Sequence, residues 1–328
     1  MQATSEQQRW MYLKMVTSRY FEEATEKAYL EGKQPVFNMA AGPIPGEMHL
    51  SNGQEPCAVG VCAHLRKDDA VTATHRPHHI AIAKGVDLPR MTAEIFGKAS
   101  GLSGGRGGHM HLFDTQVNFV CSGIIAEGMA PAAGAALSFK MRGEDRVAVA
   151  FIGEGACNQG AFHEVMNLAA VWQLPFICVI EDNQWGISVA KQASTAVPGN
   201  EVRAQAYGIP GYRVADNDPL AVFATAGQAI ARARRGEGPT LIEIETSRLA
   251  GHFMGDAEAY RPEGEKTGAI ARDPIRAMRR HLLESGVCSE GDVSVLEEDA
   301  RSTVASAFDF AREADFPQPA QALDCVFV

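Results

Sequence analysis
The chain has 328 residues, of which 46% are hydrophobic, and its formal net charge is −10. This composition supports a sizeable core, and the negative charge argues against nucleic acid or an anionic membrane surface as a partner. The seven cysteines include no C-x-x-C pair, and their odd number suits a reducing compartment, so we expect a cytoplasmic protein. No stretch reaches the roughly 18 consecutive apolar residues that a membrane-spanning helix needs.

Helices and strands are predicted to alternate along most of the chain. Apolar periodicity and capping residues indicate helices over 2–30, 54–65, 88–98, 127–141, 219–235, 274–284 and 290–314, and strands over 70–74, 147–152, 176–180, 212–214 and 240–246. Polar loops are expected over 32–51, 75–79, 100–108 and 248–267. This order predicts an α/β fold in which a mainly parallel sheet carries helices on both faces. Because no linker is evident, we expect a single domain over residues 1–328.

The segment 147–188 is the most informative part of the sequence. Residues 147–152 form an unbroken apolar run, which is typical of a strand buried on both faces, and a Gly-Glu-Gly turn at 153–155 ends it. Asn158 can cap a following helix, which a Leu-Pro pair stops before a second apolar strand over 176–180. Two parallel strands with a crossover helix are therefore predicted.

Glu154 and Asn183 directly follow these two strands. Because the carboxyl ends of parallel strands meet at one edge of a sheet, the two side chains are expected to be neighbours there. A carboxylate and a carboxamide are hard oxygen ligands that suit Mg²⁺, with help from a backbone carbonyl and phosphate oxygens. The N-terminus of the intervening helix presents N–H groups to the same place, which suits an anion. These residues therefore predict a metal–diphosphate site.

Two other interpretations of the segment stay open. A dinucleotide site would need G-x-G-x-x-G at the start of the helix, but Gly160 comes five positions after Gly155 instead of three. A glycine turn with a purely structural role is the second alternative.

The sequence GEGACNQG at 153–160, followed by EDN at 181–183, resembles the thiamine-diphosphate motif, usually written GDG followed by NN. The whole segment resembles the alpha subunits of 2-oxo acid and acetoin dehydrogenase complexes. The family's metal-binding aspartate is Glu154 here, and the first asparagine of its pair is Asp182. The resemblance implies that thiamine diphosphate contacts Gly153, Glu154, Gly155, Ala156 and Asn183, and that Mg²⁺ is held by Glu154, Asn183 and the backbone carbonyl of Trp185.

The sequence THRPHHIAIAKG at 74–85 resembles the family's Tyr- or His-Arg-x-His pattern. The resemblance implies that Arg76 contacts the diphosphate through charge-assisted hydrogen bonds and that His78 is a catalytic residue facing the reacting carbon. A surface ion pair for Arg76 and a merely polar loop position for His79 are the alternatives.

Two segments rich in glycine follow. GLSGGRGGHMHLFD at 101–114 resembles a glycine-rich stretch of the family, where the backbone can approach a ligand closely, although an ordered loop at a subunit contact is equally open. SGIIAEG at 122–128 resembles the segment that meets the aminopyrimidine ring through backbone groups. The resemblance implies that Gly123 and Ile125 make those contacts.

The loop RLAGHFMGDAEAYRPEGE at 248–265 resembles the family's GHS-x-x-D…YR loop, which covers the active site. The resemblance implies that His252 lies near the diphosphate and is the second catalytic candidate. We expect the loop to become ordered when the cofactor binds. A zinc site is a formal alternative, although the spacing is atypical and no cysteine accompanies the histidines; its ligands would come from His75, His78, His79, His109, His111 and His252.

The resemblance runs from about residue 8 to the C-terminal segment 316–328, and implies a complete alpha subunit. It also implies an α₂β₂ heterotetramer, because the glutamate that acts on the pyrimidine ring belongs to the beta subunit, and transfer of the product to a lipoyl-bearing acyltransferase. The small-molecule substrate is expected to be acetoin, then pyruvate, then a branched-chain 2-oxo acid. Alternatively, Glu154 and Asp182 mark a catalytically silent partner subunit that has lost the cofactor.

Overall fold

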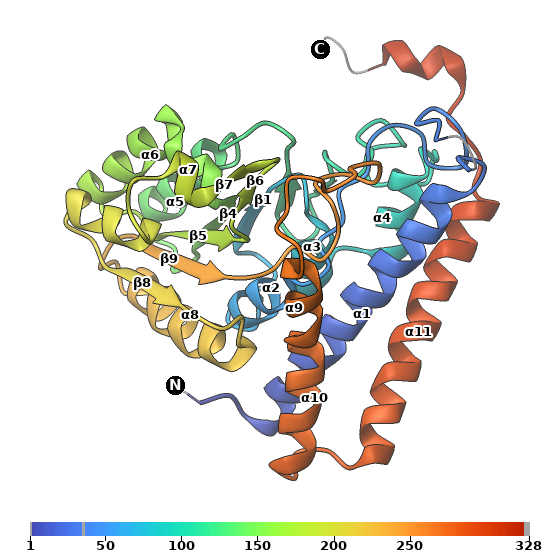
Figure 1. Cartoon of the computed structure of the whole chain (residues 1–328). Coiled ribbons are helices and arrows are strands. Elements are labelled where there is room, and N and C mark those ends of the chain that lie inside the picture. The colour runs from blue at the N-terminus through green and yellow to red at the C-terminus, as the bar shows by residue number, and fades with distance from the viewer. Residues whose placement is uncertain (1, 35–36, 325–328) are drawn as a thin grey trace.

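A computed structural model of the chain describes residues 2–34 and 37–324. Its centre is a seven-stranded sheet with the order β2–β3–β1–β4–β5–β9–β8 (Figure 1), in which all neighbouring strands are parallel except β2 and β3. The predicted mainly parallel sheet is thereby confirmed. The strands of this sheet are β1 Ala70–Ala73, β2 Phe113–Asp114, β3 Phe119–Cys121, β4 Ala148–Gly153, β5 Phe176–Asp182, β8 Gly211–Val214 and β9 Thr240–Glu245. A separate hairpin pairs β6 Trp185–Gly186 with β7 Val189–Ala190.

Helices surround the sheet, and the long helix α1 packs against both α10 and α11 beside it (Figure 1). The α-helices are α1 Ser5–Leu30, α2 Glu55–Cys62, α3 His78–Lys84, α4 Leu88–Ile95, α5 Met129–Met141, α6 Gly160–Val171, α7 Lys191–Ser194, α8 Pro219–Arg234, α9 Glu265–Ala271, α10 Pro274–Glu284 and α11 Glu290–Glu313. The 3₁₀ turns are η1 Glu154–Asn158, η2 Asn200–Tyr207 and η3 Pro319–Leu323. None of the helices in the described residues combines the length and apolar content that crossing a membrane would need.

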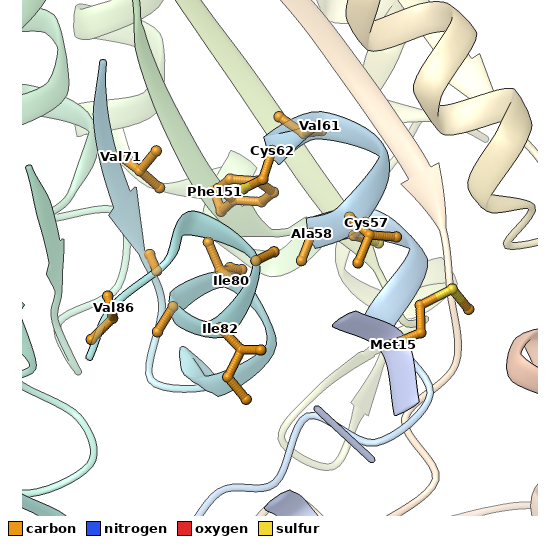
Figure 2. Packing of buried hydrophobic residues seen from close by; sticks show 14 of the residues in the cluster. Met15, Cys57, Ala58, Val61, Cys62, Val71, Ile80, Ile82, Val86 and Phe151 are labelled. Carbon is orange, nitrogen blue, oxygen red and sulfur yellow. The ribbon is translucent and has the colours of Figure 1, made fainter. Parts of the chain in front are cut away.

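Both faces of the central strands are buried. Val149 and Phe151 of β4 pack in a hydrophobic cluster that includes α2 and α8, and Figure 2 shows Phe151 there beside Cys62. The next residues along the strand, Ala150 and Ile152, point the other way and belong to a second cluster with α5 and α6. Because helices cover both faces, every position of the strand is apolar, which explains the continuous run in the sequence and confirms the two-sided arrangement.

The crossover from β4 to β5 differs in one detail from the prediction. Asn158 was expected to cap the helix, but it ends η1, and α6 begins at Gly160 with Gln159 as its N-cap. The side chain of Asn158 is engaged elsewhere: its amide donates to the carbonyl of Ser194 at 3.1 Å, and its oxygen accepts from Arg203 at 2.8 Å. The extra 3₁₀ turn therefore places Glu154 at the sheet edge before the helix starts.

Two predicted loops contain helices. His78 and His79 were assigned to a polar loop, yet they open α3 and are fully buried, because one ring nitrogen of each contacts a carboxylate from another element. The polar loop over 248–267 ends earlier than expected, since α9 begins at Glu265. The last residues of the family-like segment 316–328, namely 325–328, lie outside the described residues.

Candidate active site at the carboxyl edge of the sheet
A cavity of about 280 Å³ opens where β1, β4 and β5 end. It is the meeting point that the strand order predicts for residues far apart in the sequence. The predicted site residues that line it are Arg76, Ile125, Gly153, Glu154, Gly155, Ala156, Asn183, Trp185 and His252. His78 and Gly123 do not line it, although the neighbours of Gly123, Ser122 and Ile124, do.

Glu154 is the charged group at the end of β4. Its side chain is buried, and its Oε1 atom has no hydrogen-bond partner among the described residues. Burial, followed by the negative charge of Asp182, raises the pKa of Glu154 to about 7. An unpaired buried carboxylate oxygen is costly to ionise, and a cation in the cavity would remove that cost.

Asn183 and Trp185 lie opposite Glu154, after β5. The Asn183 amide donates to Gln54 Oε1 at 3.0 Å, and its oxygen accepts from the Trp185 backbone N–H at 3.1 Å. This orientation fixes the asparagine oxygen as an acceptor with one further lone pair. The indole N–H of Trp185 donates to Glu265 at 2.9 Å, which ties the turn to α9.

Two buried arginines give the cavity a positive region. Neither Arg76 nor Arg248 forms an ion pair with a carboxylate of the described residues. Arg76 donates to the carbonyl of Leu50 at 2.6 Å and to His252, and Arg248 donates to the hydroxyl of Tyr260 at 2.6 Å. Burial and the charge of Arg248 lower the pKa of Arg76 to about 9. Two cations held together without an ion-pair partner among the described residues favour an anionic ligand.

His252 is a neutral member of this region. Burial, followed by the charges of Arg76 and Arg248, lowers its pKa to about 4. Arg76 contacts the Nδ1 atom of its ring at 3.2 Å, and an arginine can only donate. The ring proton is therefore on Nε2, where it is available to an acceptor.

His78 and His79 do not line the cavity. The ring of His78 contacts the carboxylate of Glu22 on α1 through Nδ1 at 3.0 Å, and its Nε2 is buried without a partner among the described residues. His79 contacts Glu181 on β5 at 2.6 Å. The sequence offers no signal for the pairing with Glu22, which lies 56 positions away. The role of His78 at the reacting carbon stays a prediction.

The glycine-rich loop before His109 surrounds a carboxylate instead of the cavity. The backbone N–H groups of Ser103, Gly105 and Gly107 donate to Glu94 on α4 at 2.7, 2.9 and 2.6 Å. Gly105 needs to be glycine because its φ is +78° and a Cβ atom would meet the Gly97 carbonyl. The close backbone approach predicted for this loop is thus made to Glu94.

The loop from Arg248 to Gly264 has its own hydrogen bonds. Asp256 accepts from the backbone N–H of His252 at 2.7 Å, from that of Glu258 at 2.9 Å and from the Tyr260 hydroxyl at 2.5 Å. The Tyr260 ring also lies 5.2 Å from that of Trp185, centre to centre. The aspartate and tyrosine of the family-like pattern therefore hold His252 in place.

The histidines that were considered as zinc ligands do not gather as one group. In the described part of the chain, the cluster with metal-like spacing is His49, His75 and His252, whose ligand atoms lie within 4.8 Å of one another. Arg76 occupies the Nδ1 side of His252, and its guanidinium together with that of Arg248 makes the surroundings positive. A divalent cation would be repelled there, so the geometry favours an anion over zinc.

Several lining residues were given no role in the cofactor site from the sequence, although His75 was named as a possible zinc ligand and Glu181 lies in the quoted EDN motif: Gln54, His75, Glu181 and Arg248. Gln54 belongs to a segment that carries no recognised motif, and Arg248 was noted only as the start of a loop. A basic residue flanking the His-x-x-x-Asp-x-x-x-Tyr-Arg pattern was the available signal for Arg248.

Taken together, the fold and the cavity define an α/β protein whose sheet edge offers basic side chains to an anion and oxygen ligands to a cation. Residues 16–320 match the family model described as dehydrogenase E1 component. The chain is 40% identical over 327 residues to the alpha subunit of an acetoin:2,6-dichlorophenolindophenol oxidoreductase from Bacillus subtilis, covering 99% of this chain and 95% of that one. It is 39% identical to the protein of the same description from Cupriavidus necator, covering 97% and 93%.

The description of a third relative names a different substrate. The pyruvate dehydrogenase E1 component subunit alpha-3, chloroplastic, of Arabidopsis thaliana is 38% identical over 331 residues, covering 99% of this chain and 75% of the relative. The chain therefore belongs to the dehydrogenase E1 component family, whose members are thiamine-diphosphate-dependent oxidoreductases.

Proposed function
We propose that this chain is the alpha subunit of a dehydrogenase that uses thiamine diphosphate and Mg²⁺ to cleave acetoin or to decarboxylate a 2-oxo acid such as pyruvate. The observation that supports this most is the pairing of opposite charges across one cavity, with Arg76 and Arg248 on one side and Glu154 on the other. Acetoin ranks first because the relatives at 40% and 39% identity act on it by their descriptions, with pyruvate close behind at 38%.

The residues present fit the metal. Glu154 offers a buried carboxylate oxygen, Oε1, that has no partner in the described parts of the chain, and Asn183 offers an oriented amide oxygen. With the Trp185 carbonyl and two phosphate oxygens they would complete a set of hard oxygen ligands suited to Mg²⁺. The substitution of Glu for Asp at 154 keeps the charge, which supports a cofactor-binding subunit over a silent one.

Thiamine diphosphate, when bound, supplies a carbanion at its thiazolium ring and an electron sink for the substrate. Arg76 and Arg248 would bind the diphosphate through charge-assisted hydrogen bonds, and the buried position strengthens those bonds. His252, neutral and protonated on Nε2, would donate a hydrogen bond to an oxygen of cofactor or substrate. Gly123 and Ile125 would position the pyrimidine through their backbone groups, and His78 would act next to the reacting carbon.

We further propose a beta subunit as partner in an α₂β₂ assembly, and a lipoyl-bearing acyltransferase as the acceptor. Ile124 and Ile125 are half exposed at the rim of the cavity, which suits a site completed by another chain. Exposed small residues on α5, among them Ala130 and Gly134, suit close helix packing. A single domain is supported by the two hydrophobic clusters, which share the strands of one sheet.

The cysteines bear on the compartment. Six cysteines of the described residues are free thiols, in keeping with a reducing cytoplasm.

The test is turnover by the chain co-expressed with its beta partner. Acetoin, pyruvate and branched-chain 2-oxo acids are compared with an artificial electron acceptor, with and without thiamine diphosphate and Mg²⁺. We expect cofactor-dependent turnover that is fastest with acetoin and that is lost in Glu154→Ala. Turnover that does not depend on the cofactor would refute the proposal. So would a well-folded assembly that turns over none of the substrates.

A further inference from the structure
The residue at the end of β5 creates an electrostatic problem for a cation site. Asp182 is fully buried, and it stands where the resembling motif has a neutral asparagine. In the register of β4 and β5, Gly153 pairs with Glu181, so Glu154, which directly follows β4, and Asp182, the last residue of β5, occupy neighbouring positions at the sheet edge. Two buried carboxylates at one sheet edge repel each other, and each could compete for a divalent cation.

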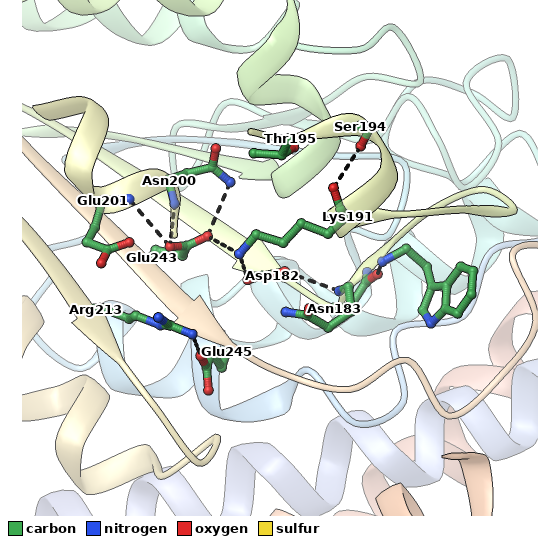
Figure 3. A network of polar contacts seen from close by, with 12 residues as sticks. Asp182, Asn183, Lys191, Ser194, Thr195, Asn200, Glu201, Arg213, Glu243 and Glu245 are labelled. Carbon is green, nitrogen blue, oxygen red and sulfur yellow. Dashed lines mark hydrogen bonds and ion pairs between the residues drawn. The ribbon is translucent and has the colours of Figure 1, made fainter. Parts of the chain in front are cut away.

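Both oxygens of Asp182 are already engaged. Oδ2 forms an ion pair with the ammonium of Lys191, which is itself buried, and Oδ1 accepts from the backbone N–H of Gln184 at 3.2 Å. Figure 3 shows Lys191 between Asp182 and Glu243. Glu154 differs, because its Oε1 has no partner in the described part of the chain. The Asp182 carboxylate is therefore already paired, whereas the Glu154 carboxylate has an oxygen available to a cation.

Lys191 is held in this position by an extended network. Its ammonium also contacts Glu243 on β9 at 2.9 Å, and Glu243 accepts from the backbone N–H of Asn200 at 2.7 Å. The backbone N–H of Lys191 donates to the carbonyl of Gln184 at 2.9 Å, which joins the two ends of the β6–β7 hairpin. The side chain of Lys191 thus connects β5 with β9, and its backbone N–H holds the segment that follows Asn183.

We infer that Lys191 is a positioning residue for the cation: it keeps the Asp182 carboxylate out of the coordination sphere and fixes the turn that presents Asn183 and the Trp185 carbonyl. This inference rests on the proposed function, because it concerns the cation of that same site. An ammonium paired with Asp182 makes the aspartate electrostatically similar to the asparagine of the family motif. Asp182 adds a negative charge relative to the asparagine of the motif, and the positive charge of Lys191 compensates for it.

The experiment measures Mg²⁺-dependent binding of thiamine diphosphate to the alpha–beta assembly, through the quenching of intrinsic fluorescence. Lys191→Met is expected to raise the Mg²⁺ concentration for half-maximal binding by about 10- to 100-fold, as loss of an outer-shell partner does. Asp182→Asn alone should leave this concentration within about threefold of the wild type, because Asp182 is not a ligand. The double variant Asp182→Asn/Lys191→Met should recover most of the loss, since the unpaired charge is gone and Glu243 keeps the backbone N–H of Asn200.

Rescue separates positioning from a purely structural role. Lys27→Met, an exposed lysine on α1, is the matched control and should behave as the wild type. Equal impairment of the single Lys191 variant and the double variant would overturn the inference, as would an unchanged Mg²⁺ requirement in Lys191→Met. If Lys191→Met does not fold, the Asp182→Asn variant decides the question. A tenfold higher Mg²⁺ concentration for half-maximal binding in that variant would identify Asp182 as a ligand and overturn the inference. Failure of the wild-type assembly to bind the cofactor at all would count instead against the proposed function.

Discussion

Glu154 is expected to destabilise the protein without its ligand, and the size of this effect follows from its pKa. The pKa rises from an ordinary 4.5 to about 7 in the fold, because the carboxyl is buried beside Asp182. At about 1.4 kcal/mol per pH unit, keeping this group ionised in the fold costs about 3 kcal/mol at pH 8. Since the folded pKa is the higher one, its contribution to stability is fully present below pH 4.5 and is lost as the pH rises through about 7.

Glu154→Gln removes the titration but keeps the shape. The cost of the unpaired amide, about 1–3 kcal/mol, is the same at every pH, so the informative quantity is the change with pH. Between pH 5 and pH 8, the free energy of unfolding of the variant should rise relative to the wild type by about 2–3 kcal/mol, measured by denaturant titration without cofactor. Glu164→Gln, an exposed position on α6, is the control. If the difference in unfolding free energy between the variant and the wild type does not change with pH, the pKa of Glu154 is not raised in the fold.

Three further predictions concern the surrounding residues. Arg76→Met should weaken binding of thiamine diphosphate by about 1.5–3 kcal/mol, the value of hydrogen bonds to a charged group, and unchanged affinity in calorimetry would remove Arg76 from the anion site. Glu94→Gln should destabilise the protein by about 1–3 kcal/mol and speed trypsin cleavage at Arg106, because an amide N–H₂ would face backbone donors. Asp256→Ala should expose Arg248 and Arg261 to trypsin and weaken protection by the cofactor, since three donors lose their acceptor; wild-type cleavage rates would contradict this.

The sequence was sufficient to predict β1, β4, β5, β8 and β9 and the edge of the sheet where the cavity lies, but it did not predict the short strands β2 and β3 or the β6–β7 hairpin. Runs such as 147–152 are apolar at every position, and only burial on both faces explains such a run, so β4 and β5 could be recognised without any partner information. Parallel pairing then brings Glu154 and Asn183 to one place, because direction and register follow from the crossover.

Side-chain partners across long sequence separations could not be predicted. The amide of Asn183 is oriented by Gln54, which is 129 positions away, and His78 is held by Glu22 on another helix. Polar residues such as His78 were assigned to a loop because burial of a histidine depends on a partner that local sequence does not reveal. The glycines after residue 100 were similarly ambiguous, since backbone N–H groups bind a carboxylate such as Glu94 or a ligand equally well.

The cavity has opposite charges that do not neutralise each other, and this arrangement predicts cooperative binding. Arg76 and Glu154 line the same cavity, but burial moves the pKa of each toward its neutral form, to about 9 and about 7. A diphosphate alone would satisfy the arginines and leave the carboxylate unpaired, whereas Mg²⁺ alone would do the reverse. Only the two together satisfy both, so each should raise the affinity for the other by the same factor, about 5- to 150-fold for coupling of 1–3 kcal/mol. Calorimetric titrations of thiamine diphosphate with and without Mg²⁺, and of Mg²⁺ with and without the cofactor, measure this factor in both directions. If thiamine diphosphate and Mg²⁺ bind independently of each other, Glu154 and Arg76 do not hold parts of the same metal–cofactor complex.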